Sequence, residues 1–176
     1  MRLMIVDESQ NQKTDLTKFY IVGGVIVDSE NVGVITDGIE KIRTEKGFLP
    51  SDSLKFSTND KPSQVTTADF IEAKSEVLRL AKTTDVKFIG YAMLHAIGKN
   101  QLLEKTICMG ADSLLTKYQQ FLKEDANSRG ICLLDTLPIS TPNSYLKQTF
   151  QKRLTHPNAG HRLPNIDLLS YVTDGC

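Results

Sequence analysis

The sequence lacks long hydrophobic runs, has few cysteines and carries no excess of either charge. No apolar stretch approaches the roughly 18 residues that a membrane-spanning helix needs. The apolar run between Arg2 and Asp7 is also too short for a signal peptide. Cys108, Cys132 and Cys176 are too few and too far apart for a disulfide framework or a zinc site. We therefore expect a cytoplasmic protein with reduced thiols, with Cys108 and Cys132 in the core.

The formal net charge of +0 at pH 7 gives no whole-chain signal for nucleic-acid binding, so only a local basic patch could provide one. The length of 176 residues is typical of one domain, and we predict a single domain over residues 1–176.

Apolar strands alternate with amphipathic helices along the chain. Strands are predicted at 3–6, 19–27, 54–57, 86–96, 131–134 and 166–172, and helices at 28–46, 66–81, 100–123 and 144–154. This order predicts an α/β fold whose mixed, mostly parallel central sheet has helices on both faces and an N-terminal antiparallel hairpin. Strand 86–96 is apolar on both faces, which favours a central position. The pair Gly23-Gly24 within strand 19–27 indicates a bulge or a close approach of another backbone.

Two predicted strands end on an aspartate, Asp7 after Met4-Ile-Val and Asp135 after Cys132-Leu-Leu. In α/β sheets, ligands gather at the carboxyl ends of strands. If the two strands are adjacent and parallel, they lie about 4.8 Å apart. Both carboxylates could then bind one Mg²⁺ at about 2.1 Å, or bridge two ions about 3.5–4 Å apart. The alternative is that each aspartate only caps a strand or a helix start.

The neighbours of Asp7 are assigned by strand geometry. Successive side chains of a strand point to opposite faces, so Asp7 rather than Glu8 would line the site. Ser9 shares the face of Asp7 and could bind a phosphate or a water molecule.

A basic segment near the C-terminus contains no acidic residue and could steer a phosphodiester backbone toward the two aspartates. Its charged or titratable residues are Lys147, Lys152, Arg153, His156, His161 and Arg162. The alternative is an ordinary solvated helix face. His156 or His161 could protonate a leaving group, although the histidines lack a metal-ligand spacing.

Four fragments together resemble a large uncharacterised prokaryotic family. They are Ile5-Val-Asp7-Glu8-Ser9, Ile21-Val-Gly-Gly-Val-Ile-Val27, Leu54-Lys55 and Leu133-Leu-Asp135. Members of that family open with a Tyr/Val-Asp-Glu-Ser-Gly signature and are classed as a domain of unknown function with an RNase H-like fold. They are regarded as metal-dependent nucleases, some of them carried by mobile elements or defence loci.

The resemblance implies roles for individual residues. Asp7 and Asp135 would be ligands of Mg²⁺ or Mn²⁺, and Lys55 matches a basic position that would contact the phosphate. Independently of the resemblance, strand geometry and the local basic charge predict that Ser9, Lys152, Arg153 and Arg162 assist in binding the substrate.

The sequence departs from the family pattern at two places, after the opening signature and at the C-terminus. Gln10 stands where the family usually has glycine. The family closes with a strand that leads into a helix with a Gln-Leu-Ala-Asp-like motif, whereas Tyr171-Val-Thr-Asp174-Gly-Cys176 reaches the start of that region and stops. The resemblance thus implies a chain truncated at this end, with Asp174 either replacing the last acidic ligand or preceding it. Asp167 and Asp112 are the other candidates for that ligand, and Asp112 is expected on a solvated helix edge.

These observations predict a hydrolase that cleaves phosphodiester bonds of DNA or RNA with a carboxylate-bound Mg²⁺ or Mn²⁺. The alternative is a non-catalytic nucleic-acid-binding or regulatory module on the same fold. A flavodoxin-like binding domain fits less well because it does not explain the opening hairpin.

Overall fold

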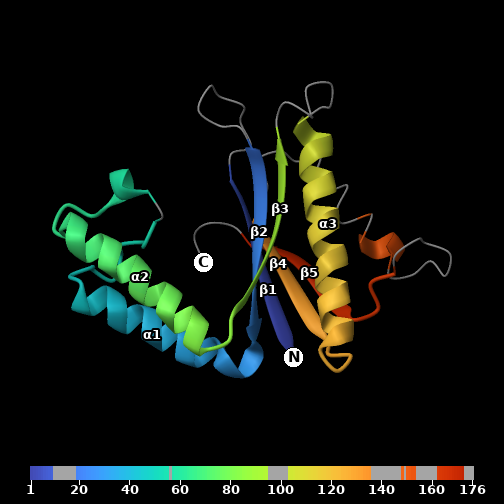
Figure 1. The fold of residues 1–176 in the computed structure, drawn as a ribbon, viewed down its shortest axis with the longest axis horizontal. Coiled ribbons are helices and arrows are strands. Elements are labelled where there is room, and N and C mark those ends of the chain that lie inside the picture. Colours follow the sequence, from blue (N-terminus) through green and yellow to red (C-terminus); the bar gives the residue numbers. More distant parts are fainter. Residues whose placement is uncertain are drawn as a thin grey trace. The chain divides into compact units, whose positions relative to one another are not determined.

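The computed structural model describes residues 1–9, 19–55, 57–94, 103–135, 148, 150–153 and 162–172. The chain divides into two compact units (Figure 1). The first unit comprises residues 1–27 and 87–176 and contains the sheet, and the second comprises Asp28–Val86 and is helical. The single RNase H-like domain expected over residues 1–176 stays a prediction.

The sheet has five strands in the order β3-β2-β1-β4-β5. β4 pairs in parallel with both β1 and β5, whereas β2 is antiparallel to both β1 and β3. The predicted α/β class and N-terminal antiparallel hairpin are therefore confirmed. The strands are β1 (Arg2–Ser9), β2 (Phe19–Asp28), β3 (Lys87–Leu94), β4 (Gly130–Asp135) and β5 (Ile166–Val172).

Two details of the predicted sheet are wrong. The sheet is evenly mixed rather than mostly parallel, and β3 lies at its edge rather than at its centre. Leu54 and Lys55 lie in irregular structure, so the chain leaves β2, passes through helices and returns as the antiparallel strand β3. A strand with a continuous apolar run can lie at the centre or at the edge of a sheet. The periodicity of the sequence therefore could not show which position β3 takes.

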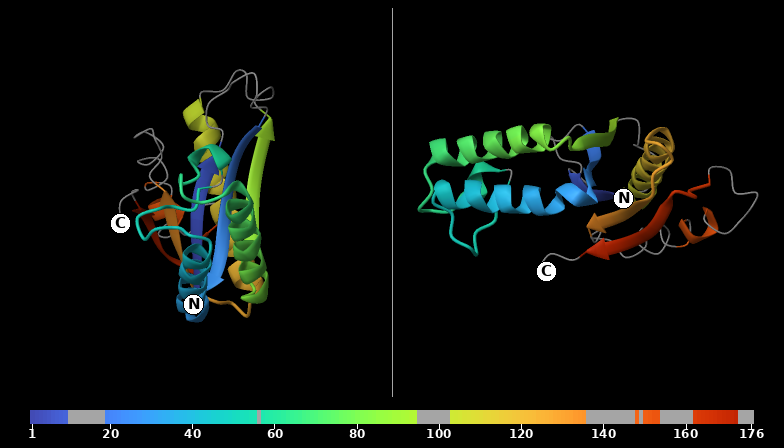
Figure 2. Two further views of the ribbon diagram at one scale, coloured as in Figure 1. Left: turned by 90° about the vertical axis from the view of Figure 1, so that its left-hand side faces the viewer. Right: turned by 90° about the horizontal axis from the view of Figure 1, so that it is seen from below.

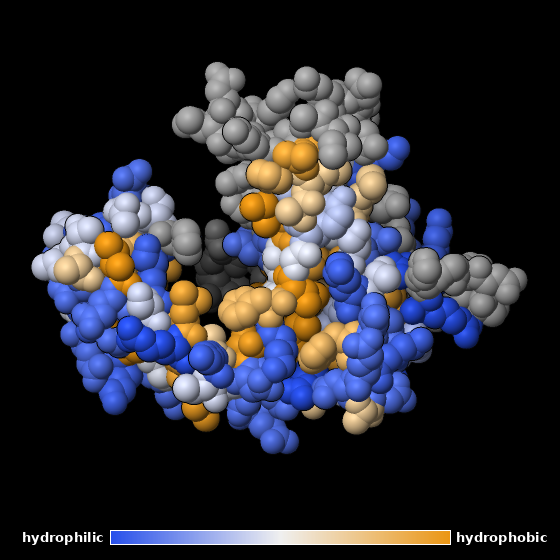
Figure 3. Space-filling model, viewed as in Figure 1, coloured by the Kyte–Doolittle hydropathy of each residue, from blue (hydrophilic) through white to orange (hydrophobic). Residues whose placement is uncertain are grey.

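The edge position leaves apolar side chains of β3 in contact with solvent. Phe88 is 62% exposed and Leu94 is 39% exposed. Figure 3 shows hydrophobic surface over β3 and the neighbouring part of helix α3 (Leu103–Glu124).

Helix α3 packs on one face of the sheet (Figure 2, right). Alternate strand residues supply the sheet side of this core, as the two-residue period requires. The strand residues are Met4, Val6, Tyr20, Val22, Ile26, Cys132 and Leu134, and those of α3 include Ile107, Leu114, Tyr118 and Leu122. The amphipathic helix predicted at 100–123 is thus confirmed over its described residues. Part of the predicted helix 144–154 is also confirmed, because residues 148 and 150–153 are helical.

The glycine pair in β2 forms no bulge, because the register with β3 runs without interruption from Phe19↔Leu94 to Ile26↔Lys87. A Cβ atom on Gly24 would lie 3.2 Å from both Cγ and Sδ of Met4. Close packing against a neighbouring side chain, not against another backbone, therefore accounts for glycine at this position.

The helical unit is a hairpin of α1 (Val32–Glu45) and α2 (Thr67–Thr83), with short 3₁₀ turns at Ser29–Asn31 and Thr58–Asp60. Thr66 caps α2, since its hydroxyl accepts a hydrogen bond from the backbone N–H of Asp69 at 3.1 Å. The small core of this unit contains Ile42, Phe48, Val65, Phe70 and Ala73.

Lys46, at the end of α1, bonds to two carboxylates of α2. Its Nζ lies 2.9 Å from Glu72 and 3.1 Å from Glu76. These hydrogen bonds raise the pKa of Lys46 and tie the two helices together.

The start of β1 is tied to the end of α3 by an ion pair. Nε of Arg2 donates to Oδ2 of Asp125 at 2.7 Å, and this hydrogen bond lowers the pKa of Asp125 from its ordinary value of 3.8. The unfolded chain therefore binds a proton at Asp125 at a higher pH than the folded chain does. The stability that the pair contributes is present above pH 3.8 and is lost as the pH falls through the lower pKa of the folded state.

We expect the free energy of unfolding of Asp125→Asn to fall less steeply with decreasing pH than that of the wild type. The contribution should stay below about 1 kcal/mol, because the pair is partly exposed. Urea denaturation of both proteins between about pH 5 and pH 2 measures it. If the two free energies of unfolding fall in parallel over this range, the ion pair does not contribute as described.

Within the described residues, no helix is long and apolar enough to cross a membrane.

Candidate functional site

The two aspartates singled out in the sequence follow neighbouring parallel strands. The register of β1 with β4 aligns Met4 with Cys132, Ile5 with Leu133 and Val6 with Leu134. Asp7 and Asp135 are the next residue on each strand. One further step of the same register would set them side by side on strands about 4.8 Å apart. The adjacency and direction on which the carboxylate-pair hypothesis depends are therefore present.

Both aspartates belong to the sheet face opposite α3. Val6 and Leu134 are buried in the core with α3. Because successive strand residues alternate between faces, Asp7 and Asp135 point to the other side. Asp7 is exposed and Asp135 is partly exposed, so solvent reaches this edge of the sheet.

The sheet face that carries the two aspartates also exposes apolar side chains. Ile5, two residues before Asp7, is 42% exposed, and Leu168 of β5 is 49% exposed. The two carboxylates thus share a sheet face with exposed apolar side chains.

Two carboxylates are a sufficient protein contribution for one kind of metal site. Mg²⁺ usually keeps several waters and is held by one or two carboxylates together with substrate phosphates. Among the described residues, no group of three or more His, Cys, Asp or Glu side chains could hold a metal ion. A donor set of two carboxylates, those of Asp7 and Asp135, fits an Mg²⁺ or Mn²⁺ that shares its coordination with substrate.

Other predicted site residues lie elsewhere or outside the described part. Lys55 is exposed in the helical unit, where it lines a small pocket with Leu54, Lys74, Val77 and Leu78. Its contact with a phosphate held at Asp7 stays a prediction. Ser9 ends β1, and its side chain is outside the described part. Gln10, Lys147, Asp174, His156 and His161 lie wholly outside the described residues.

The other two candidates for a third acidic ligand are engaged in ion pairs. Asp112 of α3 accepts a hydrogen bond from Arg153, and its side chain is 40% exposed, as expected for a helix edge. Asp167 pairs with Arg129 near the start of β5, at the opposite end of that strand from Val172, the partner of Asp135. Neither carboxylate joins the pair at the ends of β1 and β4.

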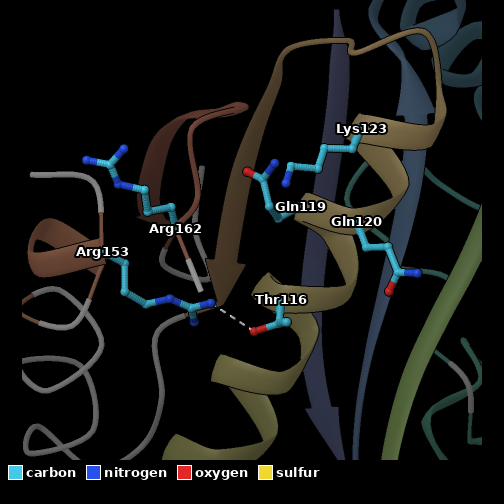
Figure 4. Close-up of a pocket in the computed structure, with 6 residues that line it drawn as sticks. All are labelled: Thr116, Gln119, Gln120, Lys123, Arg153 and Arg162. Atoms are coloured by element: carbon cyan, nitrogen blue, oxygen red, sulfur yellow. Dashed lines mark hydrogen bonds between the residues drawn. The ribbon is translucent and has the colours of Figure 1, made fainter. Parts of the chain in front are cut away.

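The described residues of the basic segment separate into different environments. Lys152 and Arg162 are exposed, whereas Arg153 is only 8% exposed. Arg153 and Arg162 line a pocket beside α3 (Figure 4). The structure thus places these two arginines with α3 and not with the two aspartates.

The pocket includes residues that sequence reasoning missed. Thr116, Gln120 and Lys123 line it at helical spacing from the side of α3. A polar stripe at positions i, i+4 and i+7 beside the apolar face was the available signal.

The buried cysteines are not candidates for nucleophiles. Cys132 is 0% exposed and Cys108 is 8% exposed, which confirms their prediction as core residues. Burial raises the pKa of the Cys132 thiol, so it stays protonated at neutral pH.

Comparisons with known proteins identify no family. No family model matches this chain, and no curated protein matches it. The RNase H-like family suggested by the short motifs therefore stays an expectation.

Proposed function

We propose that this chain hydrolyses phosphodiester bonds in nucleic acid, with Mg²⁺ or Mn²⁺ bound by Asp7 and Asp135. The observation that carries the proposal is the parallel register of β1 and β4, which brings these strand ends together. The strand order β3-β2-β1-β4-β5 supports an RNase H-like fold, which is part of the same proposal.

The protein's own contribution would be to hold and orient the metal. Asp7 and Asp135 would supply oxygen ligands from the ends of two hydrogen-bonded strands, and such rigid elements place ligands more precisely than loops. Asp7 is exposed and Asp135 is partly exposed, so water and a substrate phosphate can reach this edge of the sheet. When bound, the metal would supply an activated water and stabilise the negative charge that develops on the phosphate.

Three further residues complete the proposal. Asp174 would add a third carboxylate, Lys55 would contact the phosphate, and Ser9 would bind a phosphate oxygen or a water. They are proposed from the motifs alone.

The test is hydrolysis of single- and double-stranded DNA and RNA by the purified chain, with Mg²⁺, Mn²⁺ or EDTA. We expect activity only with metal. Asp7→Ala and Asp135→Ala should each lower it by at least about 100-fold, beyond the 10–100-fold typical when a group that only supports a metal ligand is lost. Asp37→Ala is the matched control, since Asp37 is an exposed carboxylate of α1.

Each outcome of this assay decides between the two functions. Activity in EDTA, or activity unchanged in both variants, would contradict the metal-pair proposal. Binding of nucleic acid without hydrolysis under any of these conditions would favour the non-catalytic binding module.

A further inference from the structure

The pocket beside α3 is polar and basic. It has a volume of about 280 Å³ and is lined by Thr116, Gln119, Gln120, Lys123, Arg153 and Arg162. Three of these six residues are cations and none is acidic. This volume lies just below the roughly 300–1,000 Å³ typical of small-molecule sites, so the pocket suits a small ligand or one end of a larger one.

Arg153 is held in a fixed position in the pocket wall. Its guanidinium donates a hydrogen bond to Oδ1 of Asp112. It also donates to Oγ1 of Thr116 at 3.0 Å, the bond drawn in Figure 4. Thr116 in turn donates to the backbone oxygen of Asp112 at 2.9 Å. A buried cation is costly unless it is paired, so these bonds account for the position of Arg153. The planar donor group that they orient suits the oxygen atoms of a phosphate.

Gln119 connects α3 to the segment that precedes β5. Its side-chain amide donates to Oδ1 of Asn165 at 2.7 Å and accepts from the backbone N–H of Asn165 at 2.9 Å. This pair joins α3 to the start of β5 and so fixes the two sides of the pocket relative to each other.

Lys123 and Arg162 are the two cations of the pocket without a bonding partner among the described residues. Within the described part of the chain, neither forms an ion pair or a side-chain hydrogen bond. Lys123 extends beside Gln119 in Figure 4, and Arg162 comes from the opposite wall. Two positive charges that line one pocket are unfavourable unless an anion compensates them.

The balance of charge indicates the class of anion. Among the described residues, the lining carries three cations, and two carboxylates hydrogen-bond to lining residues, Asp112 to Arg153 and Glu124 to Gln120, which leaves a net charge of +1. A phosphate monoester carries about −1.5 to −2 at pH 7, whereas each phosphodiester of a nucleic-acid backbone carries one negative charge. The net charge is therefore positive, and a monoester, which carries the larger negative charge, is attracted more strongly than a backbone phosphate.

We propose that this pocket binds a phosphate monoester attached to a small organic group, at a site separate from Asp7 and Asp135. The separation follows from the sheet, because the pocket adjoins α3 and the two aspartates point to the opposite face. A phosphorylated small molecule and the 5′-phosphorylated end of a nucleic-acid strand present the same chemistry to it. The proposal does not depend on hydrolytic activity.

The experiment is calorimetric titration at fixed, low salt with matched pairs of probes. These are a nucleoside 5′-monophosphate against its nucleoside, and a 5′-phosphorylated oligonucleotide against its 5′-hydroxyl form. We expect binding of at least one phosphorylated probe and at least tenfold weaker binding of its unphosphorylated partner. Binding of the monophosphate identifies a small molecule as sufficient, and binding of the phosphorylated oligonucleotide alone identifies a strand end.

Variants assign the binding to this pocket. Lys123→Gln and Arg162→Gln should each weaken the binding about tenfold and leave the melting temperature unchanged, because neither side chain is bonded in the described structure. Lys117→Gln, an exposed lysine on the same helix, should bind like the wild type. Asp7→Ala should also bind like the wild type, which separates this result from a failure of the nuclease proposal.

Three results would overturn the proposal. They are no binding of any phosphorylated probe, equal binding of the phosphorylated and unphosphorylated forms, and equal weakening by Lys117→Gln, which would indicate diffuse surface charge.

Discussion

Addition of Mg²⁺ is expected to raise the melting temperature of the wild-type chain and to leave Asp7→Asn and Asp135→Asn almost unchanged. The two carboxylates are far apart in the sequence and meet only when β1 and β4 pair. A metal that needs both therefore binds the folded chain and not the unfolded one. At a concentration of 100 Kd, such binding adds about 2.7 kcal/mol to the free energy of unfolding. For a chain of this size, that corresponds to a shift of roughly 5–10 °C.

Asparagine keeps the shape of aspartate but removes the charge that attracts the metal. Each single variant should lose most of the Mg²⁺-induced shift, and the double variant should lose no more than either single one, because both act on one ion. Differential scanning calorimetry with Mg²⁺ and with EDTA measures these shifts, and Asp37→Asn should respond like the wild type. An Mg²⁺-induced shift that persists in both variants would place the metal elsewhere.

Asn165→Leu is expected to destabilise the sheet unit by about 3 kcal/mol, because it removes three side-chain hydrogen bonds and leaves the buried side-chain N–H group of Gln119 without its acceptor, and each unsatisfied buried group costs about 1–3 kcal/mol. Asn165 is 5% exposed. Its side-chain amide accepts from Gln119 at 2.7 Å and donates to Oδ1 of Asn127 at 2.7 Å and to the backbone oxygen of Ser128 at 2.9 Å. Leucine makes none of these bonds.

The location of Asn165 adds to the expected effect. The turn after α3 contains Ala126 and Asn127 at φ values of 50° and 56°, a left-handed conformation that costs energy without glycine. The bonds from Asn165 hold this turn where the chain enters β4. Guanidinium denaturation gives the loss as a lower midpoint at constant slope.

Asn59→Leu is the control, because Asn59 is exposed in a 3₁₀ turn and should change stability by no more than about 0.5 kcal/mol. A decrease of less than about 1 kcal/mol in the free energy of unfolding of Asn165→Leu would contradict this expectation. It would show that water or a rearranged Gln119 replaces the hydrogen bonds of Asn165.

Several features of the fold could be predicted because they depend on local periodicity. The amphipathic helix predicted at 100–123 corresponds to α3, whose buried face contains Ile107, Leu114 and Tyr118 at helical spacing. The runs before Asp7 and Asp135 predicted two strands, which the structure contains. Which face of a helix or strand is buried is encoded in neighbouring residues, so a short stretch is sufficient to show it.

The order of the strands could not be predicted in the same way. The apolar run of β3 indicated a central strand, but β3 lies at the edge because the preceding segment is a helical hairpin with no strand at Leu54 and Lys55. The side of the sheet on which each connection passes depends on contacts between distant segments, and these leave no local periodic signal.

For the candidate site, the sequence alone determined which carboxylates end their strands, and tertiary structure decided which groups share a surface. Pairing of β1 with β4 aligned the strands of Asp7 and Asp135, whereas the bond from Arg153 to Asp112 placed part of the basic segment beside α3. The physical reason is that a residue's type and the face it occupies follow from covalent neighbours, while its partners follow from long-range pairing and the burial of charge.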